Sequence, residues 1–132
     1  MATLEFREMP LQDVWRDAHP ASAVPPEIAR LQNWRCVTDS RMVGHCTGDP
    51  MSGEIIGLSV VNDYRRQGIG RRLLALVVEA LRAAGARRIW VEAQADPTLP
   101  AYGFYRAVGW VPIGEPTREG SEILEPHANL RG

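Results

Sequence analysis

Residues 65–70 read Arg-Arg-Gln-Gly-Ile-Gly and join an apolar run that ends at Val61 to an amphipathic stretch at 70–84. The two glycines let the backbone turn sharply into a helix and approach a ligand closely. The helix would begin at this turn with unpaired N–H groups and the positive end of its dipole. Arginines crowd the same place, where positive charge repels itself unless an anion binds. The turn therefore predicts a phosphate site, and its arginines are Arg65, Arg66, Arg71 and Arg72.

Length and composition predict one globular domain over residues 1–132. The chain is 45% hydrophobic and has a formal net charge of −1, which argues against disorder and against a general attraction to nucleic acid. Its longest apolar run, residues 73–78, is far too short to cross a bilayer, and its first residues lack the apolar core of a signal peptide. We therefore expect a cytoplasmic protein with no nucleic-acid or membrane partner.

The cysteine and lysine contents narrow the kinds of site that the chain can build. Cys36 and Cys46 fall on neighbouring strand-like segments, and without a secretory signal we expect buried, reduced thiols. His45 precedes Cys46, but no spaced partners complete a zinc pattern, so no metal is expected. All 15 basic residues are arginine, which excludes a P-loop because that motif needs a lysine.

Hydrophobic periodicity predicts alternating strands and helices. Prolines break the stretch 10–33, and Gly85 stands where a helix C-terminus favours a left-handed residue. The resulting order, β-α-α-β-β-β-α-β-α-β-β, predicts an α/β fold with a mixed sheet and helices on both faces. The expected strands are 3–8, 34–38, 42–46, 54–61, 88–93, 110–114 and 122–124, and the expected helices are 11–19, 26–32, 70–84 and 101–108.

Three linked segments resemble the GNAT superfamily of acyl-CoA N-acyltransferases. Residues 65–70 fit the family's Arg/Gln-x-x-Gly-x-Gly/Ala pattern in full, and residues 58–64 (Leu-Ser-Val-Val-Asn-Asp-Tyr) match the strand and bulge that precede it. Residues 101–110 (Ala-Tyr-Gly-Phe-Tyr-Arg-Ala-Val-Gly-Trp) resemble the second signature, which ends in Tyr-x-x-x-Gly-aromatic. The resemblance is densest over about 54–110. It implies a single N-acetyltransferase domain with a mixed, mostly antiparallel central sheet.

The resemblance also implies acetyl-CoA as the acyl donor and direct transfer to a primary amine of a small molecule or peptide. The backbone of the glycine turn would bind the CoA pyrophosphate, and one or two of its arginines would add charge-assisted contacts. The preceding strand would pair with the pantetheine arm and orient the thioester carbonyl. Thr98 replaces an asparagine that contacts the arm in many relatives. The expected cofactor-binding residues are Ser59, Val60, Val61, Arg65, Arg66, Gln67, Gly68, Ile69, Gly70, Arg71 and Thr98.

Tyr105 is the candidate general acid of this reaction. Transfer from a thioester to an amine needs proximity, a deprotonated amine and a proton for the leaving thiolate. Tyr105 matches the position where the family often carries a tyrosine acid, and a phenol with a pKa of about 10 can protonate a thiolate at little cost. The alternative interpretation is an aromatic core residue, a role expected of its neighbour Phe104.

Glu54 is the candidate general base, because some family members carry a glutamate at this distance before the glycine turn. Strict alternation would place Glu54 on one face of its strand with Ile56, Leu58 and Val60, so that its side chain could point toward the acceptor. The alternative is a solvated carboxylate at a strand end. Glu92 and His45 are competing bases.

The sequence does not specify the acceptor. A few residues in and just after the stretch 10–33 could line a pocket for a cationic amine or belong to an ordinary amphipathic helix and its exposed face. They are Asp13, Trp15, Asp17, Glu27 and Trp34. A non-catalytic CoA-binding regulatory module remains the alternative function. A dinucleotide site fits poorly, because the third glycine and an acidic residue about 20 positions later are missing. An edge strand in the late hairpin could support a homodimer.

Overall fold

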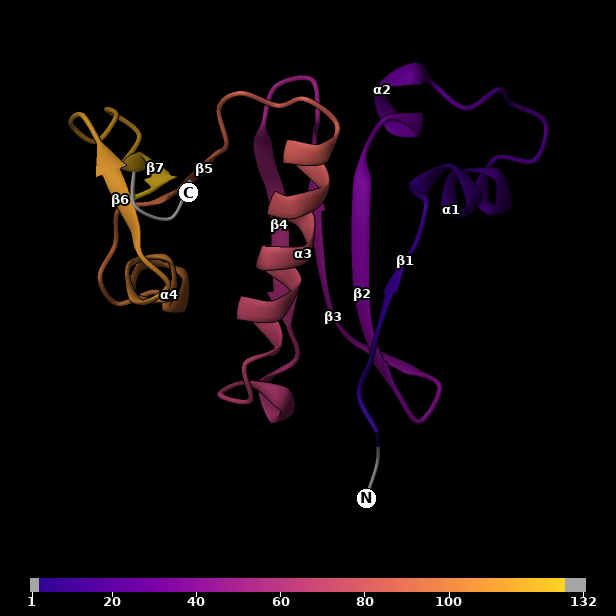
Figure 1. The fold of residues 1–132 in the computed structure, drawn as a ribbon, viewed down its shortest axis with the longest axis horizontal. Helices are drawn as coiled ribbons and strands as arrows, with labels where there is room; N and C mark the ends of the chain where they lie inside the picture. Colours follow the sequence, from indigo (N-terminus) through magenta and orange to yellow (C-terminus); the bar gives the residue numbers. More distant parts are fainter. Residues whose placement is uncertain (1–2, 128–132) are drawn as a thin grey trace. The chain divides into compact units, whose positions relative to one another are not determined.

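The computed structural model describes residues 3–127 and divides into two compact units that meet in the sequence at Arg87 and Arg88 (Figure 1). The first unit contains β1 (Glu5–Glu8), α1 (Leu11–Ala18), α2 (Pro26–Ala29), β2 (Gln32–Thr38), β3 (Arg41–Gly48), β4 (Glu54–Val60), the short 3-10 helix η1 (Asn62–Tyr64) and α3 (Ile69–Ala83). The second contains β5 (Trp90–Gln94), α4 (Pro100–Ala107), β6 (Trp110–Ile113) and β7 (Ser121–Pro126). This order confirms the expected mixed α/β class.

Four antiparallel strands form the sheet of the first unit, in the order β1-β2-β3-β4. Asp39 and Ser40 join β2 to β3 with φ values of 50° and 61°, the paired positive angles of a two-residue hairpin turn whose twist suits its strands. The register between β3 and β4 shifts between Thr47 and Gly48, as at a β-bulge. This shift changes which residues of β4 share a face.

Helix α3 packs on one face of this sheet, and two glycines of β3 allow its close approach. A Cβ added at Gly48 would lie 2.7 Å from Cγ1 of Val77, and one added at Gly44 would lie 3.1 Å from Cδ1 of Leu73. The expected apolar stripe of the helix is confirmed as part of the core. Its buried members are Ile69, Leu73, Leu74, Val77 and Leu81.

The two cysteines lie in the same core. Cys36 on β2 and Cys46 on β3 are free and fully buried, as expected from the sequence. Burial raises the pKa of the Cys46 thiol to about 12, so this thiol stays protonated at neutral pH. Within residues 3–127, no three His, Cys, Asp or Glu side chains are placed to hold a metal ion, and no helix is long and apolar enough to cross a membrane.

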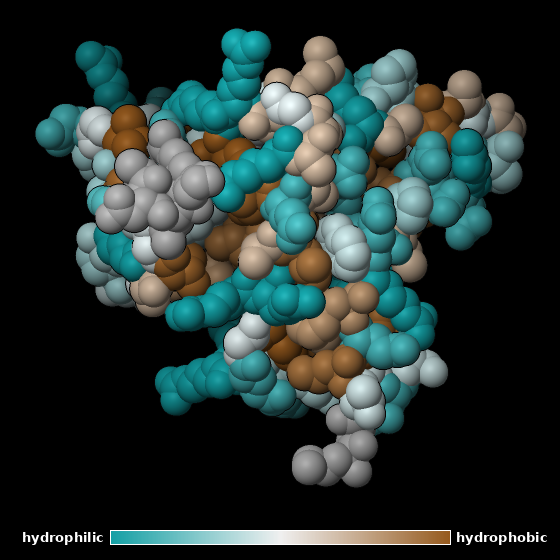
Figure 2. Space-filling view, viewed as in Figure 1, coloured by the Kyte–Doolittle hydropathy of each residue, from teal (hydrophilic) through white to brown (hydrophobic). Residues whose placement is uncertain are grey.

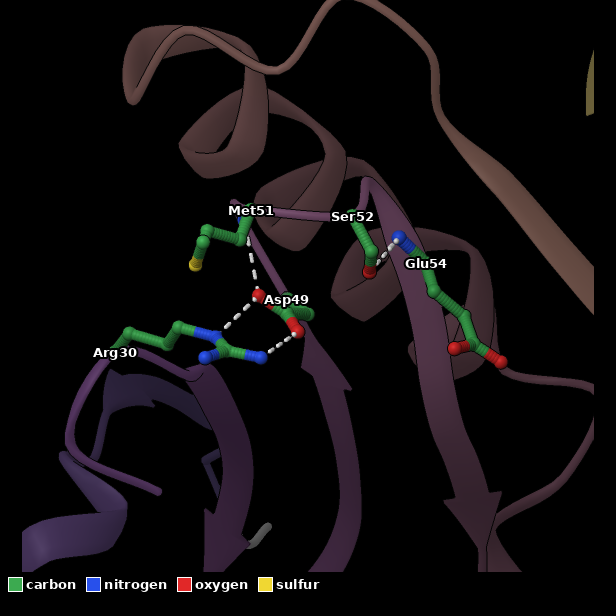
Figure 3. A network of polar contacts seen from close by, with 5 residues as sticks. All are labelled: Arg30, Asp49, Met51, Ser52 and Glu54. Atoms are coloured by element: carbon green, nitrogen blue, oxygen red, sulfur yellow. Dashed lines mark hydrogen bonds and ion pairs between the residues drawn. The ribbon is translucent and has the colours of Figure 1, made fainter. Parts of the chain in front are cut away.

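An ion pair joins the end of α2 to the turn before β4 (Figure 3). Arg30 donates from Nε and Nη2 to the two carboxylate oxygens of Asp49, at 2.9 and 2.8 Å. The N–H of Met51 also donates to Asp49, and the N–H of Glu54 donates to Oγ of Ser52. The hydrogen bond from Arg30 holds the pKa of Asp49 below its ordinary value. This network fixes the turn from which β4 begins.

The second unit is an antiparallel sheet in the order β5-β7-β6 with one helix. Tyr105 of α4 and Trp110 of β6 are buried with ring centroids 5.6 Å apart. Arg106 donates to Glu122 of β7 at 2.8 Å, and its guanidinium lies 3.5 Å from the centroid of the Tyr102 ring. These contacts hold the helix against its strands.

The exposed apolar side chains are dispersed over several elements rather than gathered on one. Hydrophilic residues lie between and around the apolar patches on the face seen in Figure 2. Val111 and Ile113 of β6 are exposed and alternate along the strand, so they share a face. The homodimer expected on this hairpin stays a prediction. The remaining exposed large apolar residues are Val14, Met42, Met51, Ile56 and Leu99.

Candidate functional site

The glycine turn forms the start of α3 without any side-chain cap. Gly68 occupies the cap position with a φ of 79°, in the left-handed region that glycine adopts without strain. The first backbone hydrogen bond of the helix runs from the N–H of Arg72 to the carbonyl of Gly68 at 3.0 Å. The N–H groups of Ile69, Gly70 and Arg71 therefore have no acceptor within the helix. The first turn carries no acidic residue, so this helix start suits an external anion.

The structure separates the four arginines of the turn into two pairs. Arg65 donates from Nε to the carbonyl of Val60 at 3.1 Å, and the guanidinium of Arg72 lies 5.9 Å from the Phe6 ring centroid. Arg66 and Arg71 are exposed and make no hydrogen bond or ion pair with any residue in the part of the chain described. Within residues 3–127, these two guanidinium groups make neither a hydrogen bond, an ion pair nor a ring contact that would compete with an external anion.

The main chain of β4 offers only part of what the sequence predicts for a pantetheine arm. The N–H of Val61 donates to the carbonyl of Val43 on β3 at 2.9 Å. Main-chain groups of successive strand residues point to opposite edges, so Ser59 shares the edge of Val61 and also faces β3. Val60 and Leu58 present their groups to the other edge. The edge that each residue faces depends on pairing with β3, so the sequence alone could not distinguish Leu58 from Ser59 in this respect.

Glu54 lies on the face of the sheet opposite α3. Gly48 and Gly44 both face α3, as their close approaches to that helix show. Their partners on β4 are Ile55 and Val60, and paired residues project to the same face. Ile55 therefore faces α3, and Glu54 beside it faces away. The expectation that Glu54 shares a face with Val60 is wrong, because the β-bulge interrupts strict alternation.

His45, one of the competing bases, is on the face that Glu54 occupies. It pairs with Ser59 of β4 and with Arg35 of β2. Burial and the positive charge of Arg35 lower the pKa of His45 below its ordinary value of 6.5. The imidazole is therefore neutral at pH 7 and able to accept a proton.

The remaining predicted residues lie in the second unit. Tyr105 is 5% exposed. Glu92 is exposed and accepts a hydrogen bond from Oγ of Ser121 at 2.7 Å. Thr98 donates from both its N–H and its hydroxyl to Oδ1 of Asp96, at 2.9 and 2.7 Å. The Thr98 hydroxyl proton thus stabilises its own loop.

A strand that leads through two glycines into an uncapped, arginine-flanked helix start is typical of α/β proteins that bind phosphate-bearing ligands. More specifically, the chain belongs to the acetyltransferase (GNAT) family, whose sequence model matches residues 3–110. This confirms the resemblance drawn from the motifs. No curated protein matches the chain.

Solved structures of acetyltransferases share the fold. The PaiA N-acetyltransferase of Thermoplasma acidophilum, in complex with coenzyme A, has a TM-score of 0.71 and 16% identity, over 94% of this chain and 98% of that one. The ribosomal-protein-S18-alanine N-acetyltransferase of Escherichia coli has a TM-score of 0.66 and 21% identity, over 94% and 93%. A Bacillus anthracis protein described as a streptothricin acetyltransferase, in complex with acetyl coenzyme A, has a TM-score of 0.65 and 19% identity. The match covers 74% of this chain and spans only 62% of that longer one.

Proposed function

We propose that residues 1–132 act as a single N-acetyltransferase domain, which moves an acetyl group from acetyl-CoA directly to a primary amine of a small molecule or peptide. The observation that carries the proposal is the start of α3, with its unpaired N–H groups and two unengaged arginines. Membership of the acetyltransferase family supports the reaction class. Structural neighbours that hold acetyl coenzyme A or coenzyme A support the donor.

The donor would lie along the path from β4 to α3. The N–H groups of the first turn of α3 would bind the pyrophosphate, and Arg66 and Arg71 would add charge. The outward edge of β4 at Val60 and Leu58 would pair with the pantetheine arm. The sequence predicted that Arg65 contacts the pyrophosphate. Its Nε instead donates to the carbonyl of Val60, so Arg65 would hold the end of β4.

The chemistry needs one acid and one base. The amine nitrogen attacks the thioester carbonyl carbon, a C–N bond replaces the C–S bond, and the thiolate leaves. By its place in the second family signature, Tyr105 would give the thiolate its proton. The ammonium form of the acceptor must first lose a proton to a base. Glu54 is the candidate that the sequence supplies, directly or through water, on the face opposite α3.

Calorimetry with acetyl-CoA, CoA and NAD tests the donor site. We expect binding of both CoA ligands and none of NAD. Arg71→Ala should weaken acetyl-CoA binding about 10-fold, because it removes a charge-assisted contact. The matched control is Arg82→Ala, at the other end of the same helix. Binding of NAD without binding of CoA would overturn the proposal.

Thiol release from acetyl-CoA in the presence of amines tests the enzyme. Tyr105→Phe should lower kcat by about 100-fold while acetyl-CoA binding changes little, and Tyr102→Phe on the same helix is the control. Unchanged turnover in Tyr105→Phe would remove this residue from the mechanism. CoA binding without thiol release would instead indicate the non-catalytic module.

A further inference from the structure

The face of the first sheet opposite α3 carries a row of polar side chains that the proposed donor site does not use. Arg35 on β2, His45 on β3 and Ser59 on β4 are direct neighbours across three strands. Ser59 lies between Leu58 and Val60, the residues proposed to meet the pantetheine arm. The row therefore ends beside the segment that would hold the thioester.

Distance along the sheet favours His45 over Glu54 as the group that meets the acceptor there. Directly paired residues of antiparallel strands have Cα atoms about 5 Å apart, and His45 is paired with Ser59. Glu54 precedes Ser59 by five residues, which corresponds to roughly 15 Å along a strand. A carboxylate so far along β4 would reach the same point only through water, whereas His45 lies directly beside Ser59.

Gly57 leaves room for the imidazole above β4. A Cβ added at Gly57 would lie 3.9 Å from Cε1 of His45, an ordinary van der Waals contact. The ring of His45 therefore leans from β3 over the neighbouring strand. A branched side chain at position 57 would occupy the space into which the ring reaches.

Burial and the neighbouring Arg35 both favour the unprotonated form of this imidazole. Within residues 3–127 no carboxylate forms an ion pair with Arg35, and its Nε is buried without a hydrogen-bond partner. Burial is the larger cause of the lowered pKa of His45, and the positive charge of Arg35 adds to it. On the same face, Arg7 of β1 is the cross-strand neighbour of Arg35 and forms an ion pair with Glu5 of its own strand, and Glu54 lies at the start of β4.

We propose that His45 is the general base that takes the proton of the acceptor ammonium, and that Arg35 tunes it. The inference rests on the proposed function. It gives to His45 the proton removal first assigned to Glu54, and leaves to the Glu54 charge the attraction of the ammonium. An imidazole nitrogen accepts the proton, the freed amine attacks the thioester carbonyl carbon, and the C–S bond breaks. The thiolate takes a proton from Tyr105, the acid proposed above. The second proton that the attacking nitrogen loses restores the Tyr105 phenol, and His45 returns its own proton to solvent.

The test is the pH dependence of thiol release from acetyl-CoA, with glycinamide, ethanolamine and water as acceptors. Water needs the same base when it replaces the amine, so turnover is measurable without the natural acceptor. In the wild type we expect kcat to fall only below pH 6.5. His45→Gln should lower kcat about 100-fold or more at pH 7.5 with little change in acetyl-CoA binding, and this fall at low pH should disappear.

Two further variants separate tuning from structure. Arg35→Gln should shift the low-pH fall toward higher pH, and NMR titration should find a higher pKa for His45 than in the wild type. Arg7→Gln, in the same row but paired with Glu5, is the matched control and should move neither. Glu54→Gln should change kcat far less than His45→Gln.

The outcomes distinguish this inference from the proposed function. Thiol release that persists in His45→Gln, or a low-pH fall that only Glu54→Gln removes, would overturn the role of His45. Absence of acetyl-CoA binding, or of thiol release with every acceptor, would overturn the proposed function and this inference with it.

Discussion

Arg66 is held in a backbone conformation that favours glycine, at the point where the anion is proposed to bind. Its φ is 66°, in the left-handed region, which costs an L-residue with a Cβ roughly 1–2 kcal/mol. Strain of this kind persists where surrounding structure or function requires it. Arg66 is exposed and unengaged, so we expect its charge, rather than a structural contact, to account for the presence of arginine at this position.

Two substitutions at Arg66 separate strain from charge. Arg66→Gly removes both, whereas Arg66→Ala removes the charge and keeps the strained Cβ. We expect both variants to weaken acetyl-CoA binding equally, but Arg66→Gly to be more stable than Arg66→Ala by about 1 kcal/mol. Urea unfolding and calorimetry measure the two quantities. Equal stabilities would show that the left-handed conformation is not populated in solution.

Asp49 is a second residue whose role can be tested, through stability. Arg30 lowers the pKa of Asp49 below 3.8 in the folded state, so its contribution to stability is complete above pH 3.8 and is lost as the pH falls through the folded value. Asp49→Asn should lower the midpoint of thermal unfolding by several degrees at pH 7 and much less at pH 2. Asp13→Asn, in the exposed pair with Arg16, should leave the midpoint unchanged at both values.

At the scale of elements, the sequence patterns predicted every major strand and helix of the described chain within a few residues. The apolar stripe of α3 and the apolar run of β4 are local signals, readable from neighbours in sequence. Two features were beyond such reasoning. The three residues of η1 are too few to show periodicity. The bulge that places Glu54 on the sheet face opposite Val60 depends on pairing with β3. Register is a property of two strands, so one strand's pattern cannot reveal it.

The packing of α3 on β3 leads to a prediction about two glycines. Gly48→Ala would place a Cβ 2.7 Å from Cγ1 of Val77 and 2.9 Å from Cδ1 of Leu81. We expect a loss of about 1–3 kcal/mol, the usual cost of overpacking a core. Gly103→Ala, inside α4, meets nothing within 4 Å and should instead stabilise the protein by about 0.5–1 kcal/mol. Urea unfolding of both variants checks the contrast, and a stable Gly48→Ala would mean that α3 can move away from the sheet.

At the scale of the whole molecule, the candidate site could be predicted in outline but not in detail. The glycine turn could be proposed as the donor site from sequence because its motif is contiguous in the chain. The assignment of Arg66 and Arg71 to the anion, and of Arg65 to a strand carbonyl, required coordinates. The role proposed for His45 likewise rests on its pairing with Ser59, to which no motif points.

The proposal of one domain can be tested separately from the reaction. Tryptophans report on each unit, Trp15 and Trp34 in the first and Trp90 and Trp110 in the second. One variant keeps only the tryptophans of the first unit and another keeps only those of the second, with phenylalanine at the other two positions. If the chain is one cooperative domain, tryptophan fluorescence should report the same urea midpoint for both variants. Acetyl-CoA at about 100 times its Kd should raise the free energy of unfolding by about 2.7 kcal/mol. Both midpoints should therefore move together to higher urea concentration. Two separate midpoints, with only one moved by the ligand, would mean that the units fold independently and that the donor binds to one of them alone.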